Sequence, residues 1–256
     1  MYIIRSCITY FWLAVVLTIA LPFRAHVNKL AETDFEKAQS QIWRFARWIG
    51  ITGGKLLNIE YEIHGQENIP ETGSVVYVGN HQSMFDPPLL LAAIPRPSGF
   101  IVKEELRKVP IFSGWVEAIG SFFLPRGESR KSLEIIIAAA KMLKNHTHGM
   151  VIFPEGTRTH DGNIGHFKPG SLKIATRSGA SIVPFAIQHT MEVMPRGTSW
   201  MRSGRISVTF LPALTPEEIK GQDTQEMTKK IVQDIAAVVG CKIVDDTIDP
   251  QPTEQA

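Results

Sequence analysis

The 256-residue sequence predicts an α/β fold: a mixed, largely parallel sheet flanked by helices, preceded by an N-terminal membrane-associated helical segment. Two observations carry this prediction. From about residue 58, short β-branched or aromatic runs alternate with helical patterns. Before that point, the run from Ser6 to Phe23 has no charged side chain, and a full bilayer crossing needs roughly 20 apolar residues. We therefore divide the chain into residues 1–57, residues 58–244 and a polar, proline-containing tail, 245–256, which we expect to be disordered.

The uncharged N-terminal run has three interpretations. It can be a membrane anchor or re-entrant hairpin, a signal peptide that is cleaved, or a buried core helix. We favour the anchor, because a small-x-small cleavage site is poor. Basic residues are denser after the run than before it, which predicts that the main body lies in the cytoplasm.

A second helix is expected between Asp34 and Asn58, with Asp34 as its cap. Its apolar side chains recur at helical spacing, and tryptophan and arginine lie beside them. This composition is that of an interfacial membrane helix, so we expect residues 1–57 to form a membrane anchor and an interfacial amphipathic helix; the alternative is an ordinary core-facing helix. The stretch GITGGK, residues 50–55, lacks the spacing of a phosphate loop and is expected to end the helix.

The remaining elements follow in order. The strand candidates are residues 58–64, 74–79, 99–102, 121–124, 150–153, 181–187 and 205–211. The clearest helices are expected over 129–144 and from about 223 to 239. Pro184 lies inside a strand pattern, which indicates a sheet edge or a bulge.

Composition excludes some classes of protein. Lys+Arg 27 against Asp+Glu 25 gives a net charge of +2, too balanced to argue for nucleic-acid binding. The two cysteines, Cys7 and Cys241, form no disulfide framework or metal-binding spacing, and no GxSxG nucleophile motif occurs.

The first candidate for chemistry is the stretch VGNHQSMFDPPLL, residues 78–90, which holds His81 and Asp86. Pro87 disfavours helical geometry at Asp86, so a helix should begin at Pro87–Pro88, just after a loop at the end of a strand. Open α/β sheets bind ligands at that edge. Asp86 could then orient His81 as a general base, or could simply cap the helix while His81 is solvated.

The second candidate is VIFPEGTRTHDG, residues 151–162, where Glu155 and Arg158 follow another strand. Gly156 would let backbone N–H groups approach a ligand, and Arg158 suits a phosphate or carboxylate. The alternative is a turn closed by a Glu155–Arg158 ion pair. Lys103 and Arg126 also follow strands, and they could converge with Arg158 on one anion if the three strands share a sheet.

These stretches resemble the motifs of the glycerolipid acyltransferase family. NHQSMFD (80–86) matches the NHx4D motif and FPEGTR (153–158) matches the third motif. Four further segments are similar to the family over about residues 60–215: VKEELRKVPIFSG (102–114), GSFFLPR (120–126), HFKPG (166–170) and IVPFAI (182–187). The resemblance is strongest to the bacterial 1-acyl-sn-glycerol-3-phosphate acyltransferases.

The resemblance implies a glycerol-3-phosphate acyltransferase-like fold with residues 58–244 as the catalytic domain. It implies transfer of an acyl group from acyl-CoA or acyl-carrier protein to lysophosphatidate, with no other cofactor and no metal. His81 and Asp86 would be the catalytic base and its orienting group. The substrate-binding residues would be Lys103, Arg126, Glu155, Gly156, Thr157 and Arg158. Membrane lipids would be the partners, at the inner, cytoplasmic membrane with the catalytic domain facing the cytoplasm.

The motifs report the chemistry and leave the acceptor open. Pro125 stands where the family often has an acidic residue before the arginine of the second motif, which bears on the acceptor's identity. A family member acting on another lysophospholipid or an aminolipid is therefore one alternative. A non-catalytic lipid-binding protein and a secreted hydrolase are two others.

Overall fold

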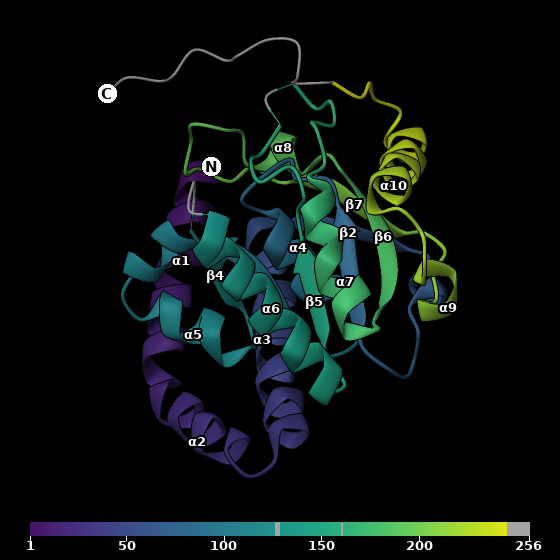
Figure 1. Cartoon of the computed structure of the whole chain (residues 1–256). Helices are drawn as coiled ribbons and strands as arrows, with labels where there is room; N and C mark the ends of the chain where they lie inside the picture. Colours follow the sequence, from purple (N-terminus) through teal and green to yellow (C-terminus); the bar gives the residue numbers. More distant parts are fainter. Residues whose placement is uncertain (126–128, 160, 245–256) are drawn as a thin grey trace.

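The computed structural model describes residues 1–125, 129–159 and 161–244 (Figure 1). Its sheet has seven strands in the order β1-β7-β6-β2-β5-β3-β4. All neighbouring pairs are parallel except β6 and β7, which are antiparallel. The predicted mixed, largely parallel sheet is confirmed.

Each strand lies within a residue or so of its predicted position. The bounds are β1 Ile59–His64, β2 Val75–Gly79, β3 Ser98–Lys103, β4 Phe122–Leu124, β5 Gly149–Ile152, β6 Ser181–Gln188 and β7 Gly204–Phe210. Pro184 lies in an interior strand. Phe185 pairs with Phe210 but Ile182 pairs with Leu214, so the register shifts by one residue around the proline. The extra residue lies opposite the proline, between Phe210 and Leu214, so a bulge accompanies Pro184 without interrupting β6.

Helices cover both faces of the sheet. Successive β2 residues point to opposite sides, as strand geometry requires: Val75 and Tyr77 face one core, and Val76 and Val78 face the other. The first core is closed by α3 (Phe35–Leu57) and α4 (Asp86–Ala93). The second is closed by α6 (Ser129–Asn145), α7 (Lys173–Ser178) and α10 (Thr224–Val239), which lie in front of the sheet in Figure 1. Because both faces of the sheet are buried, successive side chains along each strand are apolar, which explains the continuous apolar runs in the sequence.

The chain begins with two helices that run along one side of the molecule, α1 (Tyr2–Ile19) and α2 (Leu21–Ala31), before α3 returns beside them (Figure 1). Among the described residues, α1 is the one helix long and apolar enough to cross a membrane. Its two sides differ. Ser6, Thr9 and Leu17 are buried against the protein, whereas Ile4, Phe11 and Ile19 are each more than three-fifths exposed. An apolar side that none of the described residues covers is typical of a helix that associates with membranes.

Helix α3 is packed in the core over much of its length. Asp34 caps it as predicted, accepting a hydrogen bond from the Lys37 backbone. Ile42 and Trp43 are buried, while Trp48 is 46% exposed and contacts Trp12 of α1. The helix therefore packs on the core along one side, and its predicted interfacial role stays a prediction. The division of the chain at residue 57 stays a prediction, because α3 packs on α1, α2 and α4 alike.

The expectation that GITGGK ends this helix is wrong. The helix continues to Leu57 and ends at Asn58 in the left-handed conformation. Gly50 and Gly54 instead permit close packing: a Cβ atom would lie 2.8 Å from the Pro88 carbonyl oxygen at Gly50 and 2.3 Å from the Tyr61 hydroxyl at Gly54. The Tyr61 hydroxyl uses this space to donate to the Gly50 carbonyl at 2.9 Å.

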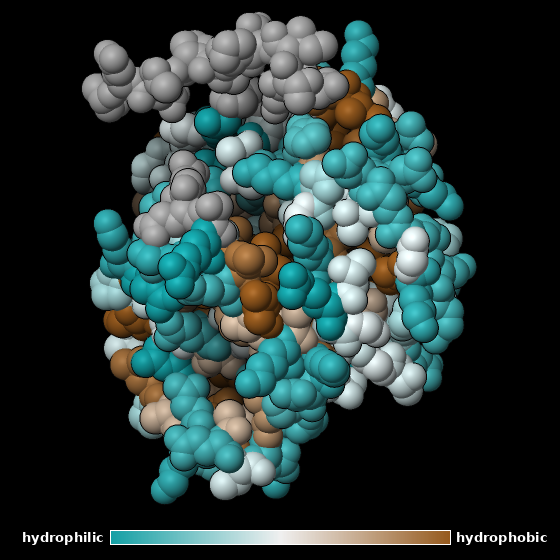
Figure 2. Space-filling view, viewed as in Figure 1, coloured by the Kyte–Doolittle hydropathy of each residue, from teal (hydrophilic) through white to brown (hydrophobic). Residues whose placement is uncertain are grey.

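Short helices complete the fold: α5 (Phe112–Ala118), α8 (Thr190–Val193), α9 (Pro216–Ile219) and the 3₁₀ turns at Gln66–Asn68, Glu104–Lys108 and Pro169–Leu172. The surface in Figure 2 is mostly hydrophilic, with apolar area in the middle of this face near α6, where Leu133 and Ile137 are exposed. The predicted tail, residues 245–256, lies outside the described residues.

Candidate active site

The loop after β2 is fixed to the neighbouring strands by its backbone and by Asn80. The Asn80 side chain accepts from the Ile187 backbone N–H at 2.8 Å and donates to the Ile187 carbonyl at 2.9 Å, joining the ends of β2 and β6. The next residue, His81, donates its backbone N–H to Glu155 and accepts from the Thr159 N–H. The loops that follow β2 and β5 are therefore locked together at the carboxyl edge of the sheet.

His81 and Asp86 form a hydrogen-bonded pair in this loop. The His81 Nδ1 atom lies 2.6 Å from Asp86 Oδ2. The carboxylate is fully buried, whereas 13% of the histidine side chain is exposed. The predicted proximity of these two residues is confirmed.

Asp86 is surrounded by hydrogen-bond donors. Its Oδ2 atom also accepts from the backbone N–H groups of Gln82 at 2.7 Å and Ser83 at 3.0 Å. Its Oδ1 atom accepts from the buried hydroxyl of Thr190. In each of these contacts a carboxylate oxygen accepts the hydrogen bond. Asp86 is the first residue of α4 and makes no capping bond to the helix, so the alternative of a plain helix cap is wrong.

The partners of His81 determine which ring nitrogen is available. Because Nδ1 faces a carboxylate, it carries the proton, and Nε2 is left as the acceptor. The imidazole also stacks on Phe153, with ring centroids 4.2 Å apart and 20° between the planes. The ring is thus fixed on one edge and on one face, with a basic nitrogen free of the carboxylate.

Glu155 and Gly156 shape the second loop. Both carboxylate oxygens of Glu155 accept backbone N–H groups, from His81 at 2.8 Å and from Gly165 at 3.2 Å. This glutamate is 8% exposed, so its observed contacts hold loops in place. Gly156 has φ +69°, and a Cβ atom there would lie 3.2 Å from the Lys168 amine. The left-handed backbone favours glycine at this position, and the Lys168 amine lies beside it.

The predicted anion-binding residues follow adjacent strands. Lys103 ends β3, and Arg158 follows β5, its direct neighbour in the sheet. Thr157 is exposed and Arg158 half-buried. Arg126 follows β4, which borders β3, but the residue itself lies outside the described part of the chain. The condition that these strands share one sheet is met, and the binding roles stay predictions.

Sequence reasoning missed three residues of this site. Thr190 follows the carboxyl end of β6, beside β2, and a search of every strand end for polar residues could have found it. Phe153 and Lys168 belong to the quoted motifs, but only the fold shows that one stacks on His81 and the other lies next to Gly156. Nothing in their local sequence specifies those contacts.

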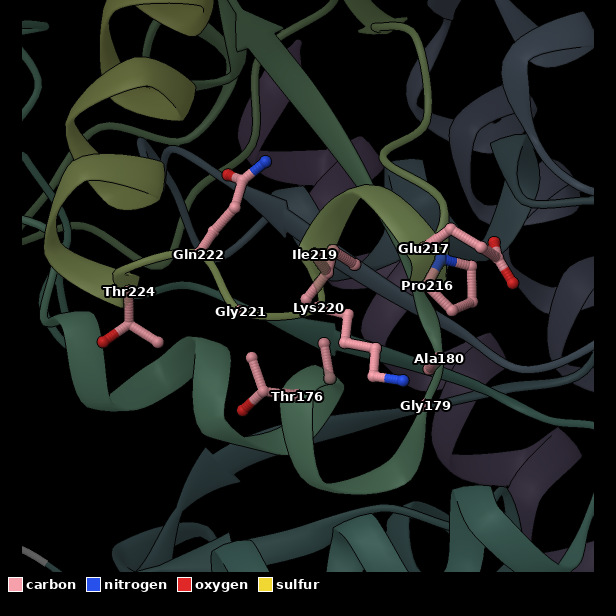
Figure 3. A pocket seen from close by; sticks show the side chains of 11 residues that line it. Thr176, Gly179, Ala180, Pro216, Glu217, Ile219, Lys220, Gly221, Gln222 and Thr224 are labelled. Atoms are coloured by element: carbon pink, nitrogen blue, oxygen red, sulfur yellow. The ribbon is translucent and has the colours of Figure 1, made fainter.

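A cavity of about 630 Å³ lies elsewhere, at the opposite edge of the sheet (Figure 3). It is bounded by the end of α7, by α9 and by the residues before α10; its polar lining includes Thr176, Glu217, Lys220, Gln222 and Thr224. None of the candidate site residues that the structure describes lines it. Within the described residues, no group of three or more histidine, cysteine or acidic side chains could hold a metal.

Known proteins with similar sequences are acyltransferases. The chain is 34% identical over 137 residues to the chloroplast 1-acyl-sn-glycerol-3-phosphate acyltransferase LPAT1 of Arabidopsis thaliana, covering 53% of this chain and 38% of that protein. It is 31% identical to the Borreliella burgdorferi enzyme of the same name, covering 53% of this chain and 54% of that one. The chain thus spans about half or less of these two relatives. It is 29% identical to the Pseudomonas aeruginosa enzyme, covering 84% and 79%.

A solved structure has the same architecture. The crystal structure of the 1-acyl-sn-glycerophosphate (LPA) acyltransferase PlsC from Thermotoga maritima superimposes with a TM-score of 0.77 at 27% identity. The match covers 94% of this chain and 97% of the other. The Acyltransferase family model matches residues 60–188, a range that contains His81, Asp86 and both loops of the site. The chain therefore belongs to the Acyltransferase family.

Proposed function

We propose that this protein transfers an acyl group from acyl-CoA or acyl-carrier protein to the sn-2 hydroxyl of 1-acyl-sn-glycerol-3-phosphate, giving phosphatidate. The observation that carries the proposal is the His81–Asp86 hydrogen bond of 2.6 Å, which leaves Nε2 of His81 as its basic ring nitrogen at the ligand-binding edge of the sheet. The relatives named above give the substrate class.

The proposed step is direct attack of an alcohol on a thioester. His81 Nε2 takes the proton of the acceptor hydroxyl while its oxygen attacks the thioester carbonyl carbon. The carbon–sulfur bond then breaks, and the imidazolium returns the proton to the departing thiolate. Asp86 stabilises the imidazolium and holds the ring in place, without itself taking the proton. A thioester is already activated, so no covalent acyl-enzyme is required.

The acceptor phosphate is bound by cations of the strand ends. Lys103, Arg126 and Arg158 are proposed to hold it, with Arg158 offering a planar fork of donors. Glu155 acts indirectly, by holding the two loops together. Fixing the phosphate sets the distance from the sn-2 hydroxyl to His81, and such positioning is a large part of catalysis between two substrates.

Membrane lipids are the proposed partners. Both acceptor and product are lipids, and the outward apolar side of α1 gives the protein a surface that can enter a bilayer. The excess of basic residues after α1 supports placement at the inner membrane, with the catalytic domain on the cytoplasmic side.

The proposal is tested by acyl transfer with purified full-length protein. Lysophosphatidate is supplied with labelled acyl-CoA or acyl-carrier protein, and lysophosphatidylethanolamine and glycerol-3-phosphate serve as competing acceptors. Wild type should form phosphatidate, and the His81→Ala variant should not. His64→Ala, an exposed histidine at the end of β1, is the matched control and should keep full activity.

Two results would contradict the proposal in different ways. Activity of His81→Ala equal to that of wild type would remove the general-base mechanism. Preference for another acceptor, with His81 still required, would keep the mechanism and change the substrate.

A further inference from the structure

Residues 194–202, here called the bridging segment, connect the candidate active site to α1. At one end, the Ser83 hydroxyl donates to the Met194 carbonyl at 2.8 Å. Arg196 donates to the carbonyl of Arg158 at 3.3 Å. The segment therefore begins against both loops of the site.

At its other end, the bridging segment lies along α1. The Met201 N–H donates to the buried Ser6 hydroxyl at 2.8 Å, and the Tyr10 hydroxyl donates to the Ser199 carbonyl at 2.7 Å. The Arg202 guanidinium lies 5.9 Å from the centre of the Tyr2 ring. The α1 residues in these contacts are four positions apart and so share one side of the helix. In Figure 1 the segment is the green connection next to the N-terminus.

The outward side of α1, across the helix from these contacts, is an uninterrupted apolar stripe. Ile4, Ile8, Phe11, Val15 and Ile19 follow helical spacing and are all exposed, Phe11 by 73%. Ile3 and Cys7, which are also exposed, lie between this stripe and the bridging segment, and the segment exposes Trp200 by 40%. The segment also carries Arg196 and Arg202 and no acidic residue.

This combination is typical of the boundary between a bilayer and water. Tryptophan and tyrosine favour the headgroup level because their rings are apolar with a polar edge. Arginine beside them is attracted to anionic lipid, at about 1 kcal/mol per basic residue near the surface. The apolar stripe supplies the deeper part of the same surface.

We propose that the bridging segment is a second membrane contact, which binds the headgroups of anionic phospholipids through Trp200 and Arg202. The inference rests on the proposed membrane contact of α1 and adds a polar rim to it. Continuity with the α1 stripe and the positive charge of the segment select a lipid surface over a second copy of this chain. Because the same segment touches the loops after β2 and β5, headgroup binding holds the candidate active site at the membrane surface.

The first test asks whether Trp200 meets lipid. Full-length protein is bound to vesicles of phosphatidylcholine and phosphatidylglycerol, and brominated phosphatidylcholine is added as a quencher of indole fluorescence. Trp200→Phe should remove a large part of the quenched signal. Trp115→Phe is the matched control, because Trp115 is buried and its ring nitrogen has no hydrogen-bond partner in the structure.

The second test asks whether the charge contributes. Arg202→Gln should weaken binding to vesicles containing phosphatidylglycerol about fivefold and leave binding to pure phosphatidylcholine unchanged. Arg205→Gln is the control, since Arg205 is exposed but paired with Glu60 at 3.1 Å. Acyl transfer to lysophosphatidate in detergent micelles should stay at the wild-type level in both variants.

The inference is overturned by equal quenching in wild type and Trp200→Phe, or by equal losses in Arg202→Gln and Arg205→Gln. Capture of a soluble protein by the segment in place of vesicles would overturn it as well. The micelle assay distinguishes failure of this inference from failure of the proposed function. If the protein transfers acyl groups in micelles but Trp200 does not contact lipid, only the role of the bridging segment is contradicted. Quenching without any transfer removes only the enzyme assignment.

Discussion

The two edges of the sheet each hold a histidine, in opposite settings. His81 follows β2 at the carboxyl edge, and His148 precedes β5, the neighbouring parallel strand, at the amino edge. His81 is paired with a carboxylate and partly exposed. His148 is fully buried, and neither ring nitrogen makes a hydrogen bond of normal geometry within the described part of the chain.

The difference shows what prepares a histidine for proton transfer. Burial lowers the pKa of His148 to about 3, with the Ile119 backbone opposing the shift, so this ring stays neutral at physiological pH. Burial alone therefore makes an inert, space-filling group, packed edge-on to Phe35 with ring centroids 5.8 Å apart. His81 combines a proton on Nδ1, facing the carboxylate, with an exposed edge, and this is the combination that the proposed general base requires.

The largest effect should come from breaking the carboxyl-edge pair. Asp86→Asn keeps the size of the side chain but cannot stabilise an imidazolium, so kcat should fall by about 10³–10⁴-fold. The check is steady-state acyl transfer alongside thermal unfolding. A variant that unfolds like wild type and loses less than tenfold in kcat would contradict the role of the pair.

A smaller loss is expected when Asp86 keeps its charge but loses one donor. Thr190→Val has nearly the same shape and removes the hydroxyl that donates to Asp86 Oδ1. A hydrogen bond to a charged group contributes about 1.5–3 kcal/mol, which corresponds to about a tenfold to hundredfold lower kcat. KM for both substrates should change little. Thr190→Ser should restore most of the activity, and failure of that rescue would assign Thr190 to packing.

Arg158, a half-buried cation at the same edge, should affect substrate binding more than turnover. Arg158→Ala should raise KM for lysophosphatidate about tenfold, with kcat within about threefold of wild type, because a phosphate contact acts equally before and during the reaction. Arg158→Lys should recover part of the loss. Arg177→Ala, an exposed arginine on α7, is the control. An unchanged KM in Arg158→Ala would argue against phosphate binding.

Replacement of His148 at the amino edge should change how the free energy of unfolding depends on pH, without changing acyl transfer. The unfolded chain protonates His148 near pH 6.5, whereas the folded protein does so only near pH 3. Between these values the unfolded state binds more protons, so stability falls as the pH drops. In His148→Leu the free energy of unfolding should fall less steeply with acidification, by about 1.4 kcal/mol per pH unit.

The slope separates this effect from any packing loss, which lowers stability equally at each pH. Replacement of the exposed His26 of α2 serves as the control for removal of a histidine. An unaltered slope in His148→Leu would show that the buried ring is protonated as easily as in the unfolded chain. At neutral pH, acyl transfer by the variant should match wild type.

Much of the fold followed from local pattern. The strands were predictable because both faces of the sheet are covered, which requires continuous apolar runs bounded by turn residues. The end of α3 could not be predicted in this way, because the glycines of GITGGK are locally typical of a helix terminus. Its glycines are explained by Pro88 and Tyr61, which approach the helix from other elements.

The site was predictable where its parts are close in sequence. His81 and Asp86 share one loop, and Glu155 to Arg158 share another, so strand ends and spacing sufficed to find them. Thr190 lies 104 residues from Asp86 in the chain, and only the pairing of β6 with β2 brings its hydroxyl to the carboxylate. A contact of that kind depends on sheet order, which a single sequence does not specify.

The two-sidedness of α1 has a consequence for protein engineering. Its buried side, including Ser6 and Leu17, belongs to the folded body, so deleting the helix would expose apolar core and remove the partner of Met201. Deletion to residue 57 would also remove α3 and open the core further. To obtain a protein that stays in solution without detergent, it is better to change Ile4, Phe11 and Ile19 to lysine or glutamate. These changes place charged side chains on the outward side of the helix and leave the inward contacts in place.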